Sequence, residues 1–411
     1  MLNRQGGVRA AAAGLRRYTS VAMPSATTER PRTVDLAHAR RIWLRAQRLD
    51  VREPFGAGPA ATPLAIEHLG YVQIDTIHVI ERCHHHILYS RIPTYHREHL
   101  HRAQSVDKTV FEYWTHALAY VPTRDFPFFV RDMNRRRRSP SAWFGDVPTA
   151  DLRRVLSLLR RQGPLTIRDI DDDVLLEKDH PWVSRKPSKK ALQVLFNGGV
   201  VTVSRRSGML KTYELMDRHF GWTRRPAPAS PRTVLEYVLD RALRAQGVVT
   251  LESICHLDAR RKPLIRKLIE ARVRRGALVP VALKDADAAS HWASPEALDV
   301  AATSDAPAED LVHILSPFDP LIIQRKRLRT FFGYDHVFEV YVPKPKRRFG
   351  YFALPVLVGD QIVAAIDLKT DRQQQKLLIQ QWTWVGRGSP RRHRRVIEEE
   401  LHRFEHFQLA R

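Results

Sequence analysis

The sequence has few of the residues and segments on which several large protein classes depend. Its 411 residues include only two cysteines, Cys83 and Cys255, in unrelated contexts. Neither a disulfide framework nor a zinc-ribbon spacing can be formed from them. No apolar run approaches the ~20 residues that a membrane-spanning helix needs. We therefore expect no membrane partner, and a reducing cytoplasm is the simplest location for the protein.

The usual signatures of common enzyme chemistries are also absent. The sequence contains no Walker loop, no GxGxxG after a strand, no GxSxG, and no HxE paired with PCxxC. These motifs accompany phosphoryl transfer, dinucleotide redox chemistry, serine hydrolysis and zinc deamination. We therefore expect a protein that uses no nucleotide cofactor and no metal.

Acidic residues are scarce relative to basic ones. Asp and Glu number 44 against 68 Lys and Arg, which gives a formal net charge of +24 and a pI near 10.5. Such an excess indicates a polyanionic partner, and nucleic acid fits best. The first residues, 1–33, contain no acid before Glu29 and are expected to form a disordered basic arm. A mitochondrial transit peptide has a similar composition and remains an alternative.

A weak internal repeat predicts the architecture. RRQGPLTIRDI at residues 160–170 returns as RAQGVVTLESI at residues 244–254. Each copy follows a helical stripe and precedes a second amphipathic segment, which ends at Gly199 or Gly276 and then becomes strand-like. Helix, short Thr-led helix, helix and hairpin is the order of a winged helix. An αα-hairpin followed by a β-ribbon would give the same pattern.

We therefore predict an α+β protein with tandem winged-helix (helix-turn-helix) domains followed by a small antiparallel β domain. In the C-terminal part, strand-like segments at residues 338–343, 351–358 and 361–369 alternate with turns, and the first two would form a hairpin with a basic tip. The expected divisions are the basic arm (1–33), three winged-helix units (34–145, 146–228 and 229–304) and the β domain with a terminal helix (305–411).

Cationic residues gather in the elements that a winged helix presents to DNA. The run RRRR at residues 135–138 is expected in a linker. Charge runs of this kind are otherwise ordinary solvated faces. The expected DNA contacts are Arg185, Lys186, Lys189 and Lys190 in the second unit's recognition helix, Arg205 and Arg206 in its wing before a turn at Ser207 and Gly208, and Lys344, Lys346, Arg347 and Arg348 in the C-terminal hairpin.

The remaining chemical candidate is a polar pair inside an otherwise apolar strand. In GYVQIDTIHVI, residues 70–80, Gln73 and Asp75 share one face while Val72 and Ile74 take the other. A carboxylate beside an amide can position a water and accept its proton, or can stabilise an oxocarbenium sugar as a glycosidic bond breaks. An N-cap Asp or a solvent-facing strand edge would explain the same pattern.

Three separated blocks carry a family resemblance. They are LGYVQIDTIHVIERCHHHILYSRIPTY (69–95), FEYWTHALAYVP (111–122) and the segment from ILSPFDPL to QIVAAIDLK (314–369). Together they resemble the AlkZ/YcaQ winged-helix DNA glycosylases, over most of the chain from about residue 35 to 375. The QID triplet is similar to the glutamine-hydrophobic-aspartate motif of the YcaQ branch.

This resemblance implies a monofunctional DNA glycosylase of base-excision repair, a hydrolase that acts on N7-alkylated purines and unhooks interstrand crosslinks. It implies Gln73 and Asp75 as the catalytic pair. The expected partner is double-stranded DNA carrying alkylated or crosslinked bases, and the expected enzyme is a monomer in the bacterial cytoplasm, associated with the nucleoid. Where family members often read Gly-Arg, this chain has Ala364 and Ala365 before Asp367, so any role of that arginine is in doubt here.

Five other features near these blocks have competing interpretations. Arg82 and Arg91 are expected to contact phosphates beside a damaged nucleotide, although each would equally serve as a structural salt-bridge partner. His116 is a candidate for the active cleft. The triplet at residues 84–86 suits a metal if it alternates along a strand, but groove or phosphate contacts or a plain surface role are preferred. Asp319, in SPFDPL, is expected to cap a turn.

A non-enzymatic winged-helix transcriptional regulator is the rival interpretation. It would explain the basic charge and the repeat equally well. Such a regulator normally dimerises to match a palindromic operator. The sequence shows no heptad pattern or long apolar helix that would provide the dimer interface, so the glycosylase is the favoured hypothesis.

Overall fold

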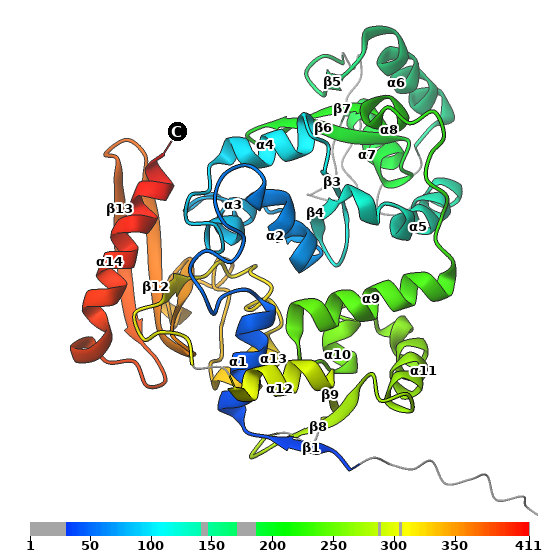
Figure 1. Cartoon of the computed structure of the whole chain (residues 1–411). Helices are drawn as coiled ribbons and strands as arrows, with labels where there is room; N and C mark the ends of the chain where they lie inside the picture. Colours follow the sequence, from blue (N-terminus) through cyan, green and yellow to red (C-terminus); the bar gives the residue numbers. More distant parts are fainter. Residues whose placement is uncertain (1–29, 141–146, 171–185, 287–288, 304–305, 411) are drawn as a thin grey trace, which may run out of the picture. The chain divides into compact units, whose positions relative to one another are not determined.

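One order of elements recurs three times along the chain. The computed structural model describes residues 30–410 except 141–146, 171–185, 287–288 and 304–305 (Figure 1). Each copy begins with a helix, which is followed by a short first strand or a single bridge. Helical structure comes next, and a hairpin closes the copy. The last strand of this hairpin pairs with the first strand or bridge residue. The helices and sheets together make this an α+β fold.

The first copy carries the predicted polar pair. Its three-stranded sheet has the order β2-β4-β3, and all pairings are antiparallel. A leading helix, α1 (Leu36–Ala46), precedes it in the chain, and α5 (Pro127–Arg138) follows it. The copy comprises α2 (Ala61–Leu69), β2 (Val72–Gln73), α3 (Cys83–Tyr89), α4 (Arg97–Ser105), β3 (Val110–Trp114) and β4 (Leu118–Pro122).

The second and third copies contain the two halves of the sequence repeat. The second has the sheet order β5-β7-β6, and in the third Val249 bridges Trp292 of β9. The second comprises α6 (Thr149–Gln162), β5 (Leu165–Thr166), α7 (Pro187–Asn197), β6 (Val201–Ser207), β7 (Leu210–Leu215) and α8 (Met216–Phe220). The third comprises α9 (Pro231–Gln246), α10 (Leu251–Ile254), α11 (Lys262–Val273), β8 (Val279–Leu283), β9 (His291–Ala293) and α12 (Pro295–Thr303).

The C-terminal part is a four-stranded antiparallel sheet with the order β10-β11-β12-β13. The predicted turn at Gly359 and Asp360 joins β11 to β12. Figure 1 shows α14 lying along β12 and β13. The elements are β10 (Val312–Ile314), α13 (Arg325–Phe332), β11 (Ala353–Val358), β12 (Gln361–Asp371), β13 (Lys376–Trp384) and α14 (Pro390–Leu409).

Local signals explain where several of these elements begin and end. Asp35 accepts a hydrogen bond from the His38 backbone N–H at 2.7 Å and so starts α1. Thr250 and Ser253 form a reciprocal capping box that starts α10. Gly199 follows α7 at φ +63°, in the left-handed region where a side chain is disfavoured. The predicted helix stop at this glycine is therefore confirmed.

Buried side chains join the copies to one another. One core cluster packs the first copy's helices against β11, β12 and α14. A second cluster packs β3 and β4 against the second copy, so the sheet of the first copy contributes to two cores. The third copy has a core of its own. The first copy is thus held from both sides, and this fixes the strand that carries Gln73.

Four local predictions were wrong. Residues 32 and 33, predicted to lie in the disordered arm, belong to β1 (Arg32–Val34), which pairs in parallel with β8. Residues 135–138 end helix α5 instead of lying in a linker. The histidine triplet lies in helix α3 and is buried or partly buried, so the plain surface role expected for it is wrong. The wing turns one residue later than expected, because Ser207 pairs with Leu210.

The predicted strand at residues 338–343 does not form. Its backbone joins no sheet, because buried carboxylates satisfy the N–H groups that a hairpin ladder would have used. Glu339 accepts hydrogen bonds from the backbone N–H groups of Arg348 and Phe349 at 2.5 and 2.6 Å. Asp367 accepts two more, from Tyr351 and Phe352. The segment is consequently a loop with one 3-10 turn at Lys344–Lys346.

Among the described residues, no helix is long and apolar enough to cross a bilayer.

Candidate active site

The predicted polar pair lies where the first strand of the first copy ends. Gln73 pairs with Ala119 of β4, and the Ile74 backbone N–H still donates to Leu118 O at 2.8 Å. The chain then leaves the sheet, so the predicted strand through Asp75 is shorter than expected. Asp75 Oδ1 accepts the Ile77 backbone N–H at 2.9 Å, which forms a tight local turn. Gln73 is buried, whereas the Asp75 side chain is half-buried.

His116 holds the Gln73 side chain. It lies in the turn between β3 and β4, and its Nε2 is 3.0 Å from Gln73 Oε1. Burial, reinforced by the nearby His256 and Arg241, lowers the pKa of His116 to about 4. The ring is therefore neutral at ordinary pH and donates through Nε2 to the amide oxygen. This orientation leaves the Gln73 amide N–H₂ group available as a donor.

Cys83 fixes the main chain beneath Gln73. Its thiol donates to Gln73 O at 3.1 Å from the start of α3. Burial, together with the nearby Asp75 charge, raises the pKa of Cys83 well above its usual value. The thiol therefore stays protonated and is a weak donor, not a nucleophile.

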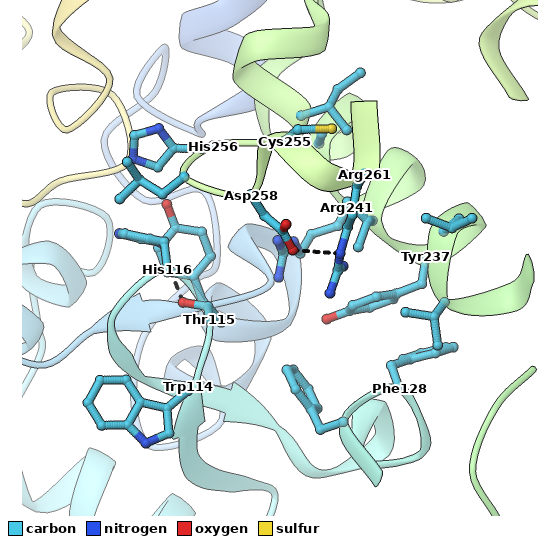
Figure 2. Close-up of a pocket in the computed structure, with 18 of the residues that line it drawn as sticks. Trp114, Thr115, His116, Phe128, Tyr237, Arg241, Cys255, His256, Asp258 and Arg261 are labelled. Atoms are coloured by element: carbon cyan, nitrogen blue, oxygen red, sulfur yellow. Dashed lines mark hydrogen bonds and ion pairs between the residues drawn. The ribbon is translucent and has the colours of Figure 1, made fainter. Parts of the chain in front are cut away.

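A cavity of about 710 Å³ opens next to this pair, between the first and third copies. Neither Gln73 nor Asp75 lines it, but His116 does, so one residue is shared between the pair and the cavity. We call it the Arg241 cavity. Figure 2 shows side chains from β3, α5, α9 and the segment after α10 directed around it. Its lining includes Tyr71, Trp114, His116, Tyr237, Arg241 and His256.

Edge-on ring contacts connect the cavity wall to the pair. The His116 ring centroid lies 5.1 Å from those of both Tyr71 and His256, in edge-on contacts. The Arg241 guanidinium lies 5.6 Å from the ring centroids of Tyr71 and Tyr237. Tyr237, Arg241 and His256 were not predicted as site residues from the sequence. The i,i+4 spacing of Tyr237 and Arg241 on one helix face was the available signal.

Arg91 does not contact DNA as predicted. Its side chain is 0% exposed, and it uses all five N–H groups inside the protein. Two bonds reach the Asp319 carboxylate, two reach the main-chain and side-chain oxygens of Gln47, and one reaches Ile87 O. Asp319 also accepts the Leu321 backbone N–H, which confirms its turn-capping role. The buried ion pair between Arg91 and Asp319 therefore links the segment after α3 to the segment before α13.

Arg206 is likewise engaged inside the protein. It forms a two-pronged ion pair with buried Glu112 at 2.5 and 2.6 Å and is 6% exposed. Its charge therefore balances Glu112, and the prediction that it meets phosphate from the wing is wrong. Lys190 is also buried, at 5% exposure, on the core side of α7. Arg91, Arg206 and Lys190 thus point into the protein. The order of charged residues in the sequence does not show which of them do so.

The other predicted cations remain accessible. Lys189 and Arg205 are exposed, and Lys186 and Arg82 are partly buried. In the C-terminal loop, Arg347 is partly buried, with its guanidinium 4.8 Å from the Tyr351 ring centroid. Arg185 lies outside the described residues. The exposed loop residues are Lys344, Lys346 and Arg348.

The histidine triplet has structural contacts. His86 Nε2 is 2.7 Å from Ile314 O, and His85 Nδ1 is 2.7 Å from the Tyr95 hydroxyl. Burial lowers the pKa of both rings to about 4. No group of three or more His, Cys, Asp or Glu side chains in the described ranges is arranged to hold a metal ion.

Ala364 and Ala365, at the position where the arginine is missing, are fully buried in β12. The neighbouring Asp367 has a structural contact set of its own. Gly350 passes so close to it that an added Cβ would lie 2.3 Å from Asp367 Oδ2. The carboxylate therefore anchors the loop before β11 through backbone N–H groups.

Comparisons with known proteins identify the family and agree with the overall fold. A family model described as "DNA glycosylase AlkZ-like" matches residues 66–407, which include Gln73 and Asp75. Among solved structures, the Streptomyces sahachiroi DNA glycosylase AlkZ is similar to this chain, with a TM-score of 0.59 and 17% sequence identity. That likeness covers 91% of this chain and 96% of the other, and at this identity it shows the fold alone.

Proposed function

Because the chain belongs to the AlkZ-like DNA glycosylase family, we propose that it hydrolyses the N-glycosidic bond of N7-alkylated purines in duplex DNA and unhooks interstrand crosslinks. Hydrolysis would make it monofunctional, with an abasic site as its product. One observation carries the proposal. An amide oriented by a neutral histidine lies two residues from an accessible carboxylate, at the end of one strand.

The proposed chemistry needs few protein groups. Alkylation at N7 of guanine places a positive charge on the base, which then leaves without protonation by an acid. Asp75 offsets the positive charge that develops on the sugar and accepts the proton of the attacking water. The water oxygen bonds to C1′ as the bond from C1′ to the base breaks. The Gln73 amide group, whose oxygen is occupied by His116, orients that water.

DNA would be held by the exposed cations of the repeat units. We propose that the three copies are tandem winged helices, since each has a sheet in which the first strand pairs with the last. Lys189 at the start of α7 and Arg205 in the β6–β7 hairpin would contact phosphates. The loop carrying Lys344, Lys346 and Arg348 would press against the duplex. We propose a monomer, since a single chain brings all of these together.

The substitution Asp75→Asn tests the proposal. The wild-type protein, incubated with duplex DNA carrying N7-methylguanine, should leave abasic sites that alkali converts to strand breaks, and no breaks before alkali. Asp75→Asn should lower the single-turnover excision rate by at least about 100-fold, because one carboxylate carries both the charge and the proton. Binding to the same DNA should persist.

A matched control is available at Asp371. Its Oδ1 accepts the backbone N–H groups of Gln373 and Gln374 in a turn like that of Asp75, at the end of β12. Asp371→Asn should excise like the wild type. Full activity of Asp75→Asn would remove Asp75 from its role. Binding to DNA without excision by the wild type, on any alkylated or crosslinked duplex, would favour a regulator instead.

A further inference from the structure

The proposed reaction leaves most of the Arg241 cavity unused. Gln73 and Asp75 lie outside its lining, and only His116 belongs to both. Its volume, about 710 Å³, is in the range of pockets that bind small ligands. Its lining therefore needs an explanation beyond the excision chemistry.

Contacts with neighbouring residues fix the orientation of two aromatic side chains that line the cavity. Trp114 is 37% exposed, and its Nε1 donates to Asn197 Oδ1 at 2.5 Å. The Tyr237 ring stacks on Phe128 with centroids 4.0 Å apart and planes 13° apart, and its hydroxyl donates to Asp125 at 2.9 Å. These rings enter the cavity already oriented (Figure 2). Preoriented aromatic faces are what nucleic-acid bases stack on.

Arg241 differs from the other arginines of the lining. Its guanidinium lies over Tyr71 and Tyr237 and hydrogen-bonds with the Tyr237 side chain, and within the described part of the chain no carboxylate lies within ion-pair distance. Four of the other five pair with a carboxylate, and the fifth donates to a main-chain oxygen. Arg131 donates to Ala229 O, Arg135 and Arg136 pair with Asp132, and Arg260 and Arg261 pair with Asp258.

The position of Arg241 is built into the backbone. A Cβ at Gly70 would lie 2.3 Å from Arg241 Cδ, so the side-chain stem occupies space that only glycine leaves open. Gly70 also has φ +77°, in the left-handed region, where it ends α2 just before the Gln73 strand. Gly70 thus shapes both the start of the proposed catalytic strand and the position of the Arg241 side chain.

We propose that the Arg241 cavity binds one unpaired nucleotide of the DNA, with its base against Trp114 and Tyr71 and its phosphate at Arg241. Aromatic faces beside an arginine that has no carboxylate partner suit a ligand with both an aromatic ring and a negative charge, as a nucleotide has. The half-buried rings of His116 and His256 lie where the base edge would need hydrogen-bonding partners. This inference rests on the proposed function for the identity of the ligand as DNA, and it places the unpaired nucleotide next to the bond that is cut.

Binding of three fluorescein-labelled duplexes at one fixed salt concentration tests this assignment. One duplex carries a single bulged adenosine, one carries an abasic tetrahydrofuran at the bulge, and one is fully paired. The protein used is Asp75→Asn, so that excision does not alter the probe. The bulged adenosine should bind about tenfold more tightly than the paired duplex, consistent with the ~1–3 kcal/mol that base stacking contributes. The abasic bulge should fall between the two.

Two variants separate the base from the phosphate. Arg241→Met, which keeps the stem over Gly70, should abolish the preference for both bulged duplexes and leave binding to the paired duplex within about twofold. Trp114→Leu should remove only the difference between the bulged adenosine and the abasic bulge. Arg232→Met is the matched control, because Arg232 is on the same helix, 77% exposed and paired with Glu236. It should behave like the parent protein.

Equal binding of all three duplexes by the parent protein would overturn the inference. So would a bulge preference that survives in both Arg241→Met and Trp114→Leu, since bulged DNA would then be chosen for its flexibility alone. The failure of the cavity assignment and the failure of the proposed function give different results. Excision by the wild type without bulge preference refutes only the cavity assignment, whereas bulge preference without excision refutes only the glycosylase.

Discussion

The same position of the repeat is used in two different ways. Thr166 is the last residue of β5 in the second copy, Thr250 follows the bridge residue Val249 in the third, and each bonds to the residue three positions later. Thr166 bonds to Asp169 through its backbone N–H and its hydroxyl, and Thr250 forms a capping box with Ser253. Within the described part of the chain, both polar side chains bond only inside their local turns. They have a structural role.

Gln73 occupies the equivalent position in the first copy. Its strand, β2, pairs with β4 as β5 of the second copy pairs with β7. In each copy the preceding residue faces a tyrosine, because Val72 pairs with Tyr120 and Leu165 pairs with Tyr213. Its side chain, however, bonds to His116 from the far hairpin. A longer segment follows before α3, and Asp75 closes a turn there. In the first copy, the polar side chain at this position therefore does not close a local turn, and it is available to the proposed active site.

Gln73→Thr is the strongest test of this difference, because it gives the first copy the residue that the other copies use. We expect the excision rate to fall by ~10²–10³-fold, the usual loss when one preorganised donor is removed. Stability should fall by only about 1 kcal/mol, the net value of one hydrogen bond. Single-turnover excision and urea unfolding measure the two effects. Excision within tenfold of the wild type would show that the amide does not orient the water.

Some of this could be predicted from the sequence. The repeat revealed two copies because RRQGPLTIRDI and RAQGVVTLESI share Gly and Thr at fixed spacing. The strands at β11 and β12 followed from their apolar runs and the Gly359 turn. Gln73 and Asp75 stood out because they interrupt an apolar stretch. These features depend on residues that are close in sequence.

The errors depended on contacts between distant residues. Arg91 and Arg206 read as surface cations, yet Asp319 and Glu112, far along the chain, hold them in the interior. Residues 338–343 read as a strand, but Glu339 satisfies N–H groups that would have built the ladder. The Arg241 cavity lies between two copies, so no local pattern contains it.

Helix α3 of the first copy carries a buried histidine that should make the protein sensitive to acid. His86 is 0% exposed and donates to Ile314 O, while within the described residues its Nδ1 has no hydrogen-bond partner. Burial lowers its pKa to about 4, so the folded protein keeps it neutral while the unfolded chain takes up a proton below about pH 6.5. The stability present above that pH should be lost as pH falls towards 4, by up to ~3 kcal/mol from this residue alone.

Urea unfolding between pH 7 and pH 4 measures this loss. His86→Gln, which retains a donor towards Ile314, should show a shallower decline of the unfolding free energy than the wild type. A control at His406, an exposed residue of α14, should leave the decline unchanged when replaced by Gln. Identical curves for the wild type and His86→Gln would mean that acid sensitivity arises elsewhere.

The smallest effects should come from the two capping threonines themselves. Thr250→Ala removes the acceptor for the Ser253 backbone N–H at 3.1 Å and should cost about 1 kcal/mol of stability. Thr166→Ala should cost less, because its turn is exposed and Asp169 still accepts the backbone N–H of residue 166. Both variants should excise at the wild-type rate, since neither side chain touches the pair. A slowed excision by Thr250→Ala, measured at equal folded fraction, would mean that the third copy's cap positions the Arg241 cavity, and the separation of structural from functional roles would no longer hold.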